Sequence, residues 1–203
     1  MSKIIGKKMK NSEEISDTKI KMASALKKII KTKVFSKITV GDIIEETKIN
    51  RNTFYYHFEN MYDLLYWTYN KEVQNIIKTY RNSNATLIQG IDFVLEYIDK
   101  NTVLCKTVYE SLGENELKNM FEKDFNSYIE NTILFICKNT ESQITTDYKD
   151  FLTFNFSQML CSQIVWYIKY NEQLDKQKFK YYMQTTIFSS LTACINEATK
   201  KQL

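Results

Sequence analysis

The fold is decided by the stretch Ile49-Asn50-Arg51-Asn52-Thr53-Phe54-Tyr55-Tyr56-His57-Phe58. Asn50 is a favourable N-cap, and Phe54 and Phe58 are four residues apart, which predicts a short helix from Arg51 to about Phe58 with both rings facing inward. The side chains on the opposite face are Arg51, Asn52, Tyr55 and Tyr56. All four can donate hydrogen bonds to base edges or phosphates, so this helix has the chemistry of a DNA-reading element.

A second short helix is expected just before this one. Thr39, followed three residues later by Asp42, is a variant of the capping box and predicts a helix of about two turns. An amphipathic helix starts earlier, at Asp17, and Asn60 caps a long helix that runs to about Tyr80. Two short helices joined by a turn of three or four residues, between longer helices, have the proportions of a helix-turn-helix DNA reader.

The predicted DNA contacts follow from the position of each side chain. Arg51 lies in the first turn of the second short helix, where such proteins present base-contacting residues, and its guanidinium matches O6 and N7 of guanine. Asn52 can pair with adenine in the same way. The N-terminus of the first short helix, at Thr39, offers backbone amides to a phosphate. The predicted DNA-binding residues are Thr39, Lys48, Asn50, Arg51, Asn52, Thr53, Tyr55, Tyr56 and His57.

Residues 17 to about 65 resemble the N-terminal domain of TetR/AcrR-family transcriptional regulators, through the segments Ile38-Thr39-Val40, Asp42-Ile43, Ile49 to Phe58 and Leu64-Leu65. The resemblance implies a helix-turn-helix followed by a helical domain for ligand binding and dimerisation. It also implies base contacts for Arg51 and Asn52. Two positions depart from the family pattern. Lys48 stands where glycine is common in the turn, which predicts a left-handed backbone, and Met61 stands where a phosphate-contacting lysine is usual.

Composition predicts the same fold class for the whole chain. The 203 residues (24.1 kDa) contain 43% hydrophobic and 26% charged residues, close to the globular average. There is no proline and there are only four glycines, which favours helices over the tight turns of sheet proteins. We therefore expect an all-α protein with a flexible basic tail (1–16), a three-helix helix-turn-helix domain with a long connecting fourth helix (17–80), and a helical dimerisation and ligand-binding domain (81–203). The linker is expected at Arg81-Asn82-Ser83-Asn84.

The charge distribution indicates where DNA would bind. The net charge is +4, but residues 1–60 carry 13 Lys+Arg against 7 Asp+Glu, while residues 61–203 carry 15 against 17. A positive N-terminal third favours double-stranded DNA as the partner. No stretch has the length and apolarity of a signal peptide or a membrane span, which predicts a cytoplasmic protein without a membrane partner.

Other chemistry has little support in the sequence. Cys105, Cys137, Cys161 and Cys194 are scattered, and His57 is the only histidine, so no metal site and no cofactor are expected. The cysteines are interpreted as reduced residues in helical interiors, with redox sensing as the alternative. An enzyme is not expected either, because the sequence has no glycine-rich phosphate loop and no nucleophile beside a base.

The last two predicted helices carry more apolar surface than one neighbouring helix would cover. An isologous four-helix dimer interface would bury it, and an intramolecular core is the alternative. The stretch from Phe156 to Phe179 weakly resembles the C-terminal domain of a Firmicutes-type subgroup of the same family. The predicted dimer residues are Phe156, Met159, Leu160, Met183, Ile187, Leu191 and Cys194, with Ser189, Ser190 and Ala193 permitting close approach.

Aromatic residues between the linker and the last helices could line a cavity for a small apolar effector, or could form ordinary core. The predicted pocket residues are Tyr66, Trp67, Tyr69, Phe93, Tyr97, Tyr109, Phe121, Phe125 and Trp166. The sequence therefore favours a ligand-responsive repressor that binds a palindromic operator as a homodimer. The alternative is a protein-binding accessory or co-regulator of the same fold, in which the changed turn and the missing lysine weaken DNA binding.

Overall fold

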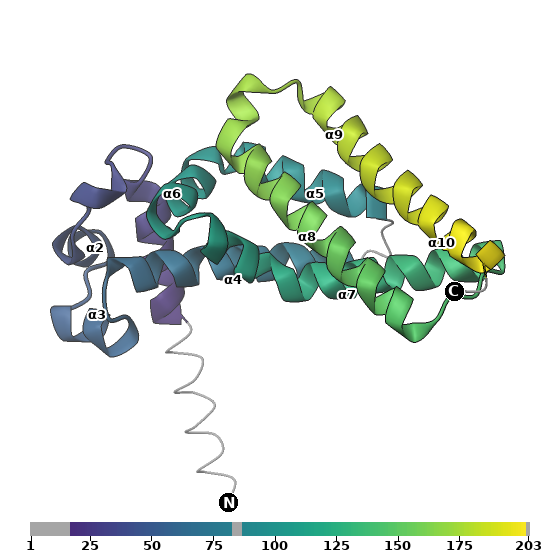
Figure 1. Ribbon diagram of the computed structural model, residues 1–203. Helices are drawn as coiled ribbons and strands as arrows, with labels where there is room; N and C mark the ends of the chain where they lie inside the picture. The colour runs from purple at the N-terminus through teal and green to yellow at the C-terminus, as the bar shows by residue number, and fades with distance from the viewer. Residues whose placement is uncertain (1–16, 83–86, 202–203) are drawn as a thin grey trace, which may run out of the picture. The chain divides into compact units, whose positions relative to one another are not determined.

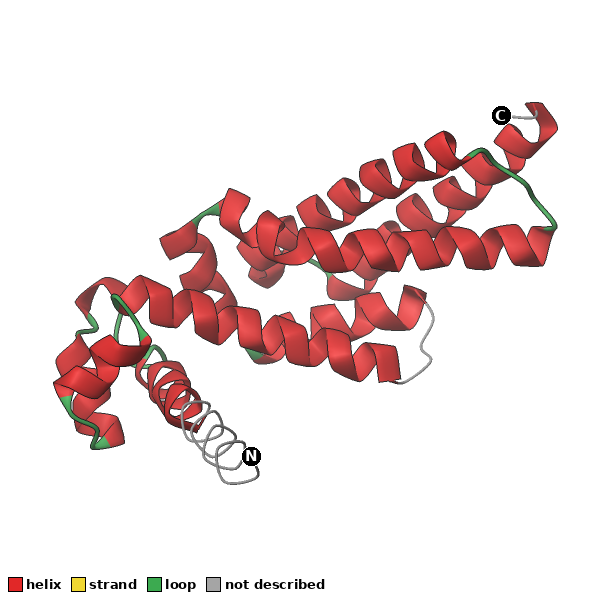
Figure 2. Cartoon of the chain, turned by 90° about the horizontal axis from the view of Figure 1, so that it is seen from below, coloured by secondary structure: helices red, strands yellow, loops and turns green. Residues whose placement is uncertain are grey.

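The computed structural model describes residues 17–82 and 87–201, and within these ranges the chain contains helices and loops but no strand (Figure 2). The all-α prediction is confirmed. After a first helix at residues 17–29 the elements are η1 (Phe35–Lys37), α2 (Val40–Thr47), α3 (Arg51–His57), α4 (Met61–Asn82), α5 (Leu87–Lys100), α6 (Thr102–Leu112), α7 (Glu114–Thr140), α8 (Thr146–Tyr170), η2 (Asn171–Gln173), α9 (Lys176–Gln184), η3 (Thr185–Ser189) and α10 (Ser190–Lys201) (Figure 1). The predicted basic tail, residues 1–16, lies outside the described residues.

Two compact units divide the chain between Glu72 and Val73, inside α4. Sequence analysis assigned the helical part of this connection to the first domain and ended it at about Tyr80. The helix continues to Asn82, so Arg81 and Asn82 belong to α4 and not to a linker. Neither residue is glycine or proline, and nothing in their local chemistry stops a helix there.

The first unit is a small helical domain around one apolar core. Met22 and Leu26 of the first helix, Ile43 of α2, Phe54 of α3 and Leu64 of α4 are all fully buried. Ion pairs join the first helix to its neighbours, since Lys27 Nζ lies 2.6 Å from Glu72 and Lys28 Nζ lies 2.7 Å from Glu46. The core and these pairs hold α2 and α3 in place within the unit.

The second unit is built on α7 and α8, two long helices that lie side by side (Figures 1 and 2). Lys149 of α8 pairs with Glu130 of α7 at 2.8 Å, and Gln158 donates to Glu122 at 3.0 Å. The opposed order of these partners shows that the helices are antiparallel.

The last of the predicted helices, expected to be continuous, is interrupted. A π-helical segment, η3, separates α9 from α10. Thr185 and Thr186 each donate to the carbonyl four residues earlier, on Tyr181 and Tyr182, at 2.9 and 2.7 Å. Such side-chain bonds compete with the regular helical pattern and often bend a helix.

α5 is tied to the C-terminal half of this unit by polar contacts. The buried Tyr167 of α8 donates to Asp99 at 2.7 Å, and Lys176 of α9 pairs with the same carboxylate. Lys180 pairs with Asp92 at 2.7 Å. These contacts fix α9 against α5.

The structure corrects the predicted dimer surface. The predicted side chains Phe156, Leu160, Met183, Ile187 and Leu191 are already buried within one chain, because α8, η3 and α10 pack their apolar stripes on each other and on α7. Met159 and Cys194 are half-buried. The alternative of an intramolecular core holds for these five positions.

Candidate nucleic-acid interface

The two faces of α3 have different chemistry. Phe54 is fully buried and Phe58, at its C-cap, is 2% exposed, so both rings point into the first unit as their spacing predicted. On the opposite face Tyr55 is 51% and Tyr56 71% exposed. Arg51 and Asn52 are also exposed. Four hydrogen-bonding side chains thus share the solvent face of a helix whose position is set by buried rings.

Two of the residues predicted to contact DNA, Asn50 and Thr53, also have a structural role. The Asn50 side-chain oxygen accepts from the backbone N–H of Thr53 at 2.7 Å and from the Thr53 hydroxyl at 3.0 Å. This N-cap starts α3 and fixes the rotation of its first turn. Asn50 and Thr53 therefore set the orientation of Arg51 and Asn52, and the Thr53 hydroxyl proton is already donated.

The start of α2 is closed by a full capping box. The Asp42 carboxylate accepts from the Thr39 N–H at 2.7 Å and from the Thr39 hydroxyl at 2.8 Å, and the Asp42 N–H donates back to the Thr39 hydroxyl oxygen at 3.3 Å. Since the hydroxyl proton goes to Asp42, a phosphate at this end would meet backbone amides and not the Thr39 hydroxyl.

A third residue extends this network. Lys33 Nζ lies 2.7 and 2.8 Å from the two oxygens of Asp42 and so ties the connection after the first helix to the start of α2. The hydrogen bond from Lys33 and those from Thr39 lower the pKa of Asp42 to about 2. Sequence reasoning missed Lys33, because the pairing depends on how the chain turns between residues 30 and 39.

The turn between α2 and α3 has the geometry that its sequence predicted. Lys48 adopts φ 58° and ψ 25°, the left-handed region, while its N–H donates to the carbonyl of Ile44 at 2.8 Å. A residue with a Cβ atom is strained in this conformation by about 1–2 kcal/mol. The Lys48 side chain is exposed and forms no ion pair with any residue that the structure describes.

His57 is half-buried. Its pKa is lowered by burial and, to a smaller extent, by the charge of Lys19. Lys19 Nζ lies 5.2 Å from the ring centroid of Phe58 and 5.7 Å from that of Trp67. The lysine therefore supports the aromatic end of α3 by cation–π contacts. Neutral His57 can offer one N–H to a phosphate.

The aromatic residues predicted to form an effector pocket are distributed over both units. Tyr66, Trp67 and Tyr69 belong to the first unit, where Trp67 packs against Phe58 at 5.9 Å. Trp166 is 47% exposed and lies 5.4 Å from Phe179. The others belong to the second unit: Phe93 is exposed, Tyr97 and Tyr109 are half-buried, and Phe121 stacks on Phe125.

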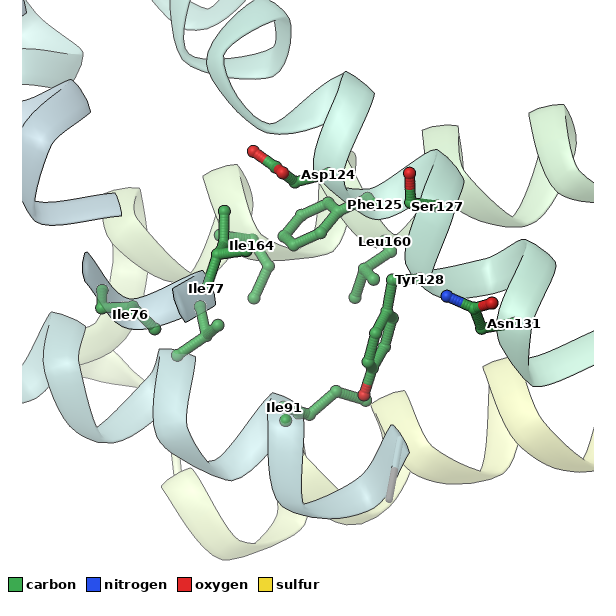
Figure 3. A pocket seen from close by; sticks show the side chains of 12 residues that line it. Ile76, Ile77, Ile91, Asp124, Phe125, Ser127, Tyr128, Asn131, Leu160 and Ile164 are labelled. Carbon is green, nitrogen blue, oxygen red and sulfur yellow. The ribbon is translucent and has the colours of Figure 1, made fainter. Parts of the chain in front are cut away.

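A cavity of about 80 Å³ does lie in the second unit (Figure 3). Its lining residues come from α4, α5, α7 and α8 and are mainly aliphatic: Ile76, Ile77, Gly90, Ile91, Val94, Asp124, Phe125, Ser127, Tyr128, Asn131, Leu160 and Ile164. Phe125 is the one residue shared with the predicted pocket. The sequence signal for this site was the aliphatic face of α4 and α5, which periodicity alone cannot distinguish from core.

Two other features of the described residues bear on the chemistry. They contain no cluster of three or more His, Cys, Asp or Glu residues that could hold a metal ion. None of their helices is both long and apolar enough to cross a membrane.

Comparison with known proteins adds to this geometry. A family profile of the TetR group, described as "Transcriptional regulator C-terminal region", matches residues 85–196, which is more than half of the chain. A curated relative is the HTH-type dhaKLM operon transcriptional activator DhaS of Lactococcus lactis subsp. lactis (strain IL1403), 28% identical over 92 residues. The match covers 43% of this chain and 46% of the relative, and so spans about half the length of the relative.

A solved structure also shares the fold. The dihydroxyacetone kinase operon activator DhaS aligns with a TM-score of 0.65 at 20% sequence identity, over 88% of this chain and 96% of that one. At this identity the similarity concerns the arrangement of helices.

Proposed function

The chain belongs to the TetR family of transcriptional regulators, and from this membership we propose that it reads DNA as a homodimer and responds to a small effector. The main support for DNA binding is the exposed face of α3. On this face Arg51, Asn52, Tyr55 and Tyr56 lie opposite two buried phenylalanines. Arg51 forms no ion pair with any described residue, so its guanidinium is available to a guanine.

The division of labour within this surface follows from the geometry. Arg51 and Asn52 occupy the first turn of α3 and are proposed to read bases. Tyr55, Tyr56 and His57 lie further along and are proposed to contact bases or phosphates. Lys48 lies in the turn and is proposed to neutralise a phosphate.

Binding titrations separate these roles. Genomic fragments selected by the protein supply the operator, and a scrambled duplex serves as reference. Arg51→Ala should weaken the free energy of binding to the operator by about 1–3 kcal/mol per half-site, and should relax the sequence preference at one base position. Lys48→Ala should weaken both duplexes alike and reduce the slope of log K against log salt by about one unit per subunit. Equal losses on both duplexes for Arg51→Ala would remove its base-reading role.

A different face of α8 from the one that sequence analysis chose supports the dimer. Phe151, Phe154 and Trp166 of α8 are 60%, 58% and 47% exposed. Ser189, Ser190 and Ala193 are exposed as well and would permit close approach of a second copy. We therefore assign the isologous contact to these two helical surfaces.

Sedimentation tests the assignment. Phe154→Glu would place a charge in the interface and should yield monomers at micromolar concentration, whereas Phe135→Glu, on an equally exposed position of α7, should leave dimers. Leu191→Glu is not a suitable test, because Leu191 is fully buried within one chain and the change would unfold it. Dimers of Phe154→Glu, or a monomeric wild type, would contradict the proposal.

The direction of regulation has two candidates. Sequence analysis predicts a repressor, while the relative and the solved structure named above are operon activators, which favours activation as the second candidate. A reporter driven by the promoter next to the selected site decides between them: expression falls with a repressor and rises with an activator. Absence of DNA binding by the wild type at low salt would instead favour the protein-binding accessory.

A further inference from the structure

We infer that Lys33 is a positioning residue for DNA binding: it holds the carboxylate of Asp42 and so masks a negative charge that would otherwise repel the DNA backbone. In this role Lys33 acts through Asp42 and does not itself contact the DNA. The inference rests on the proposed function, which brings DNA against the first unit, and it assigns a part in binding to a residue that lies outside α3.

The first turn of α2 requires a carboxylate for its own stability, although a carboxylate is unfavourable beside DNA. Asp42 accepts hydrogen bonds from the N–H and the hydroxyl of Thr39, and these bonds complete the capping box. DNA phosphates attract cations and repel such an anion. The base-reading helix α3 does not have this conflict, because its cap, Asn50, is neutral.

The charge of Asp42 is present whenever DNA binding is measured near neutral pH. Hydrogen bonds from Lys33 and from Thr39 lower the pKa of Asp42 to about 2, so the carboxylate stays ionised. Only 27% of its side chain is exposed, so water screens the charge incompletely.

The charge is also close enough to act on DNA bound at α3. The helix α2 has eight residues, which makes it about 12 Å long, and it packs directly on α3. The Debye length is about 10 Å in 0.1 M salt. A bare carboxylate on α2 would therefore be felt by the phosphates of DNA that α3 contacts.

Lys33 cancels this charge at close range. Its Nζ lies 2.8 Å from one carboxylate oxygen of Asp42 and 2.7 Å from the other, so the ammonium group bridges both oxygens. The surrounding chain fixes the lysine: its backbone N–H donates to the carbonyl of Ile29 at 3.0 Å, and Phe35, two residues later, is buried. A lysine held in this way neutralises the cap and is poorly placed to reach a phosphate.

A double-mutant cycle on the full-length protein separates charge masking from two other roles, direct phosphate contact and a purely structural tie. The variants are Lys33→Met, Asp42→Asn and the combination of both, each titrated with operator and scrambled duplexes over a salt series. Asparagine keeps the cap, because its side-chain oxygen still accepts from the N–H of Thr39.

Charge masking predicts a distinct pattern of affinities. Lys33→Met should bind both duplexes about three- to tenfold more weakly per subunit at about 50 mM salt, and the loss should shrink as the salt concentration rises. Asp42→Asn should bind at least as tightly as the wild type. The combined variant should return to within about twofold of the wild type, because no uncovered carboxylate remains.

Two other patterns would overturn the inference. A loss that persists in the combined variant, together with a slope of log K against log salt that is reduced by about one unit per subunit, would show a direct phosphate contact by Lys33. Equal losses for Lys33→Met, Asp42→Asn and the combined variant would show that the pair is only a structural tie.

Lys27 offers a matched control. It pairs with Glu72 at 2.6 Å, and 35% and 24% of these two side chains are exposed, against 36% and 27% for Lys33 and Asp42. Glu72 follows Met61, the first residue of α4, by eleven positions, or about 16 Å, which exceeds the Debye length. Lys27→Met should therefore change DNA affinity less than about twofold, and a loss as large as that of Lys33→Met would contradict charge masking at Asp42.

Far-ultraviolet circular dichroism reports whether each variant is folded. If Lys33→Met does not fold, Lys33→Arg, which keeps the charge, and the combined variant decide the matter: both should bind like the wild type, and weaker binding by the combined variant would overturn the inference. A wild type that binds no DNA at low salt contradicts the proposed function and the inference with it. Binding by the wild type, together with any of the contrary results above, contradicts only the role of Lys33.

Discussion

Replacement of Asp42 by alanine should destabilise the first unit by about 1–2 kcal/mol. The carboxylate closes the capping box of α2 through two hydrogen bonds from Thr39, and loss of such a cap costs about 1 kcal/mol. It also pairs with Lys33 at 2.7 Å, and with 36% and 27% of the two side chains exposed this pair adds at most about 1 kcal/mol.

The pKa of Asp42 gives this contribution a pH dependence. The pKa falls from 3.8 to about 2 on folding, which corresponds to about 2 kcal/mol before solvent screening is allowed for. Because the folded-state pKa is the lower one, the contribution is present above about pH 5 and is lost as the pH falls toward 2. Roughly half of it should be gone at pH 3.

Urea unfolding followed by tryptophan fluorescence measures the effect. In a Trp166→Phe background the signal comes from Trp67, which belongs to the first unit. Asp42→Ala should lower the urea midpoint at pH 7, and Asp150→Ala, a 70% exposed aspartate of α8, should not. Equal midpoints for Asp42→Ala and its parent, or a difference that is as large at pH 3 as at pH 7, would refute the reasoning.

Four further outcomes are expected. Lys48→Gly should relieve the left-handed strain and raise the urea midpoint of the first unit by the equivalent of about 1 kcal/mol; a lowered midpoint would contradict strain at this turn. Asn50→Ala should lower the unfolding free energy of the first unit by about 1 kcal/mol in the same assay, whereas Asn50→Asp retains the cap. Equal losses for the two variants would exclude capping. Tyr167→Phe removes a hydrogen bond to a carboxylate and should cost about 1.5–3 kcal/mol by circular dichroism in urea, unless the bond is absent in solution. Burial raises the pKa of the Cys161 thiol to about 12, so iodoacetamide at pH 8 should leave Cys161 unmodified until urea is added, as peptide mass spectrometry can verify.

Local signals in the sequence correctly predicted where the helices of the helix-turn-helix segment begin. Thr39, Asn50 and Asn60 each start a helix in the structure, as their cap patterns indicated. The left-handed backbone at Lys48 was also predictable, because glycine is common at this position in the family that residues 17–65 resemble. Caps and turns depend on residues within a few positions of each other, and that information is present in any short window of sequence.

Partners that are distant in sequence could not be predicted in the same way. α8 is apolar on two sides: Phe156 and Leu160 face the core, and Phe151 and Phe154 face solvent. A periodic pattern shows that a face is apolar but not which surface covers it, and so it could not show that Phe156 and Leu160 are buried within one chain. The cavity was missed for a related reason, because its aliphatic lining looks like ordinary core until the helices are placed together.

The side-chain caps at the N-termini of α2, α3 and α4 have a thermodynamic consequence for DNA binding. Asn60 accepts from the N–H groups of Tyr62 and Asp63 at 2.9 and 3.0 Å, so three successive helix starts are completed by the chain's own side chains without any ligand. The helices proposed to contact DNA are thus preorganised, and association need not include the ordering of these helices. Calorimetry on the operator should therefore give a heat-capacity change that matches the contact area of a rigid surface, well short of the value for coupled folding and binding.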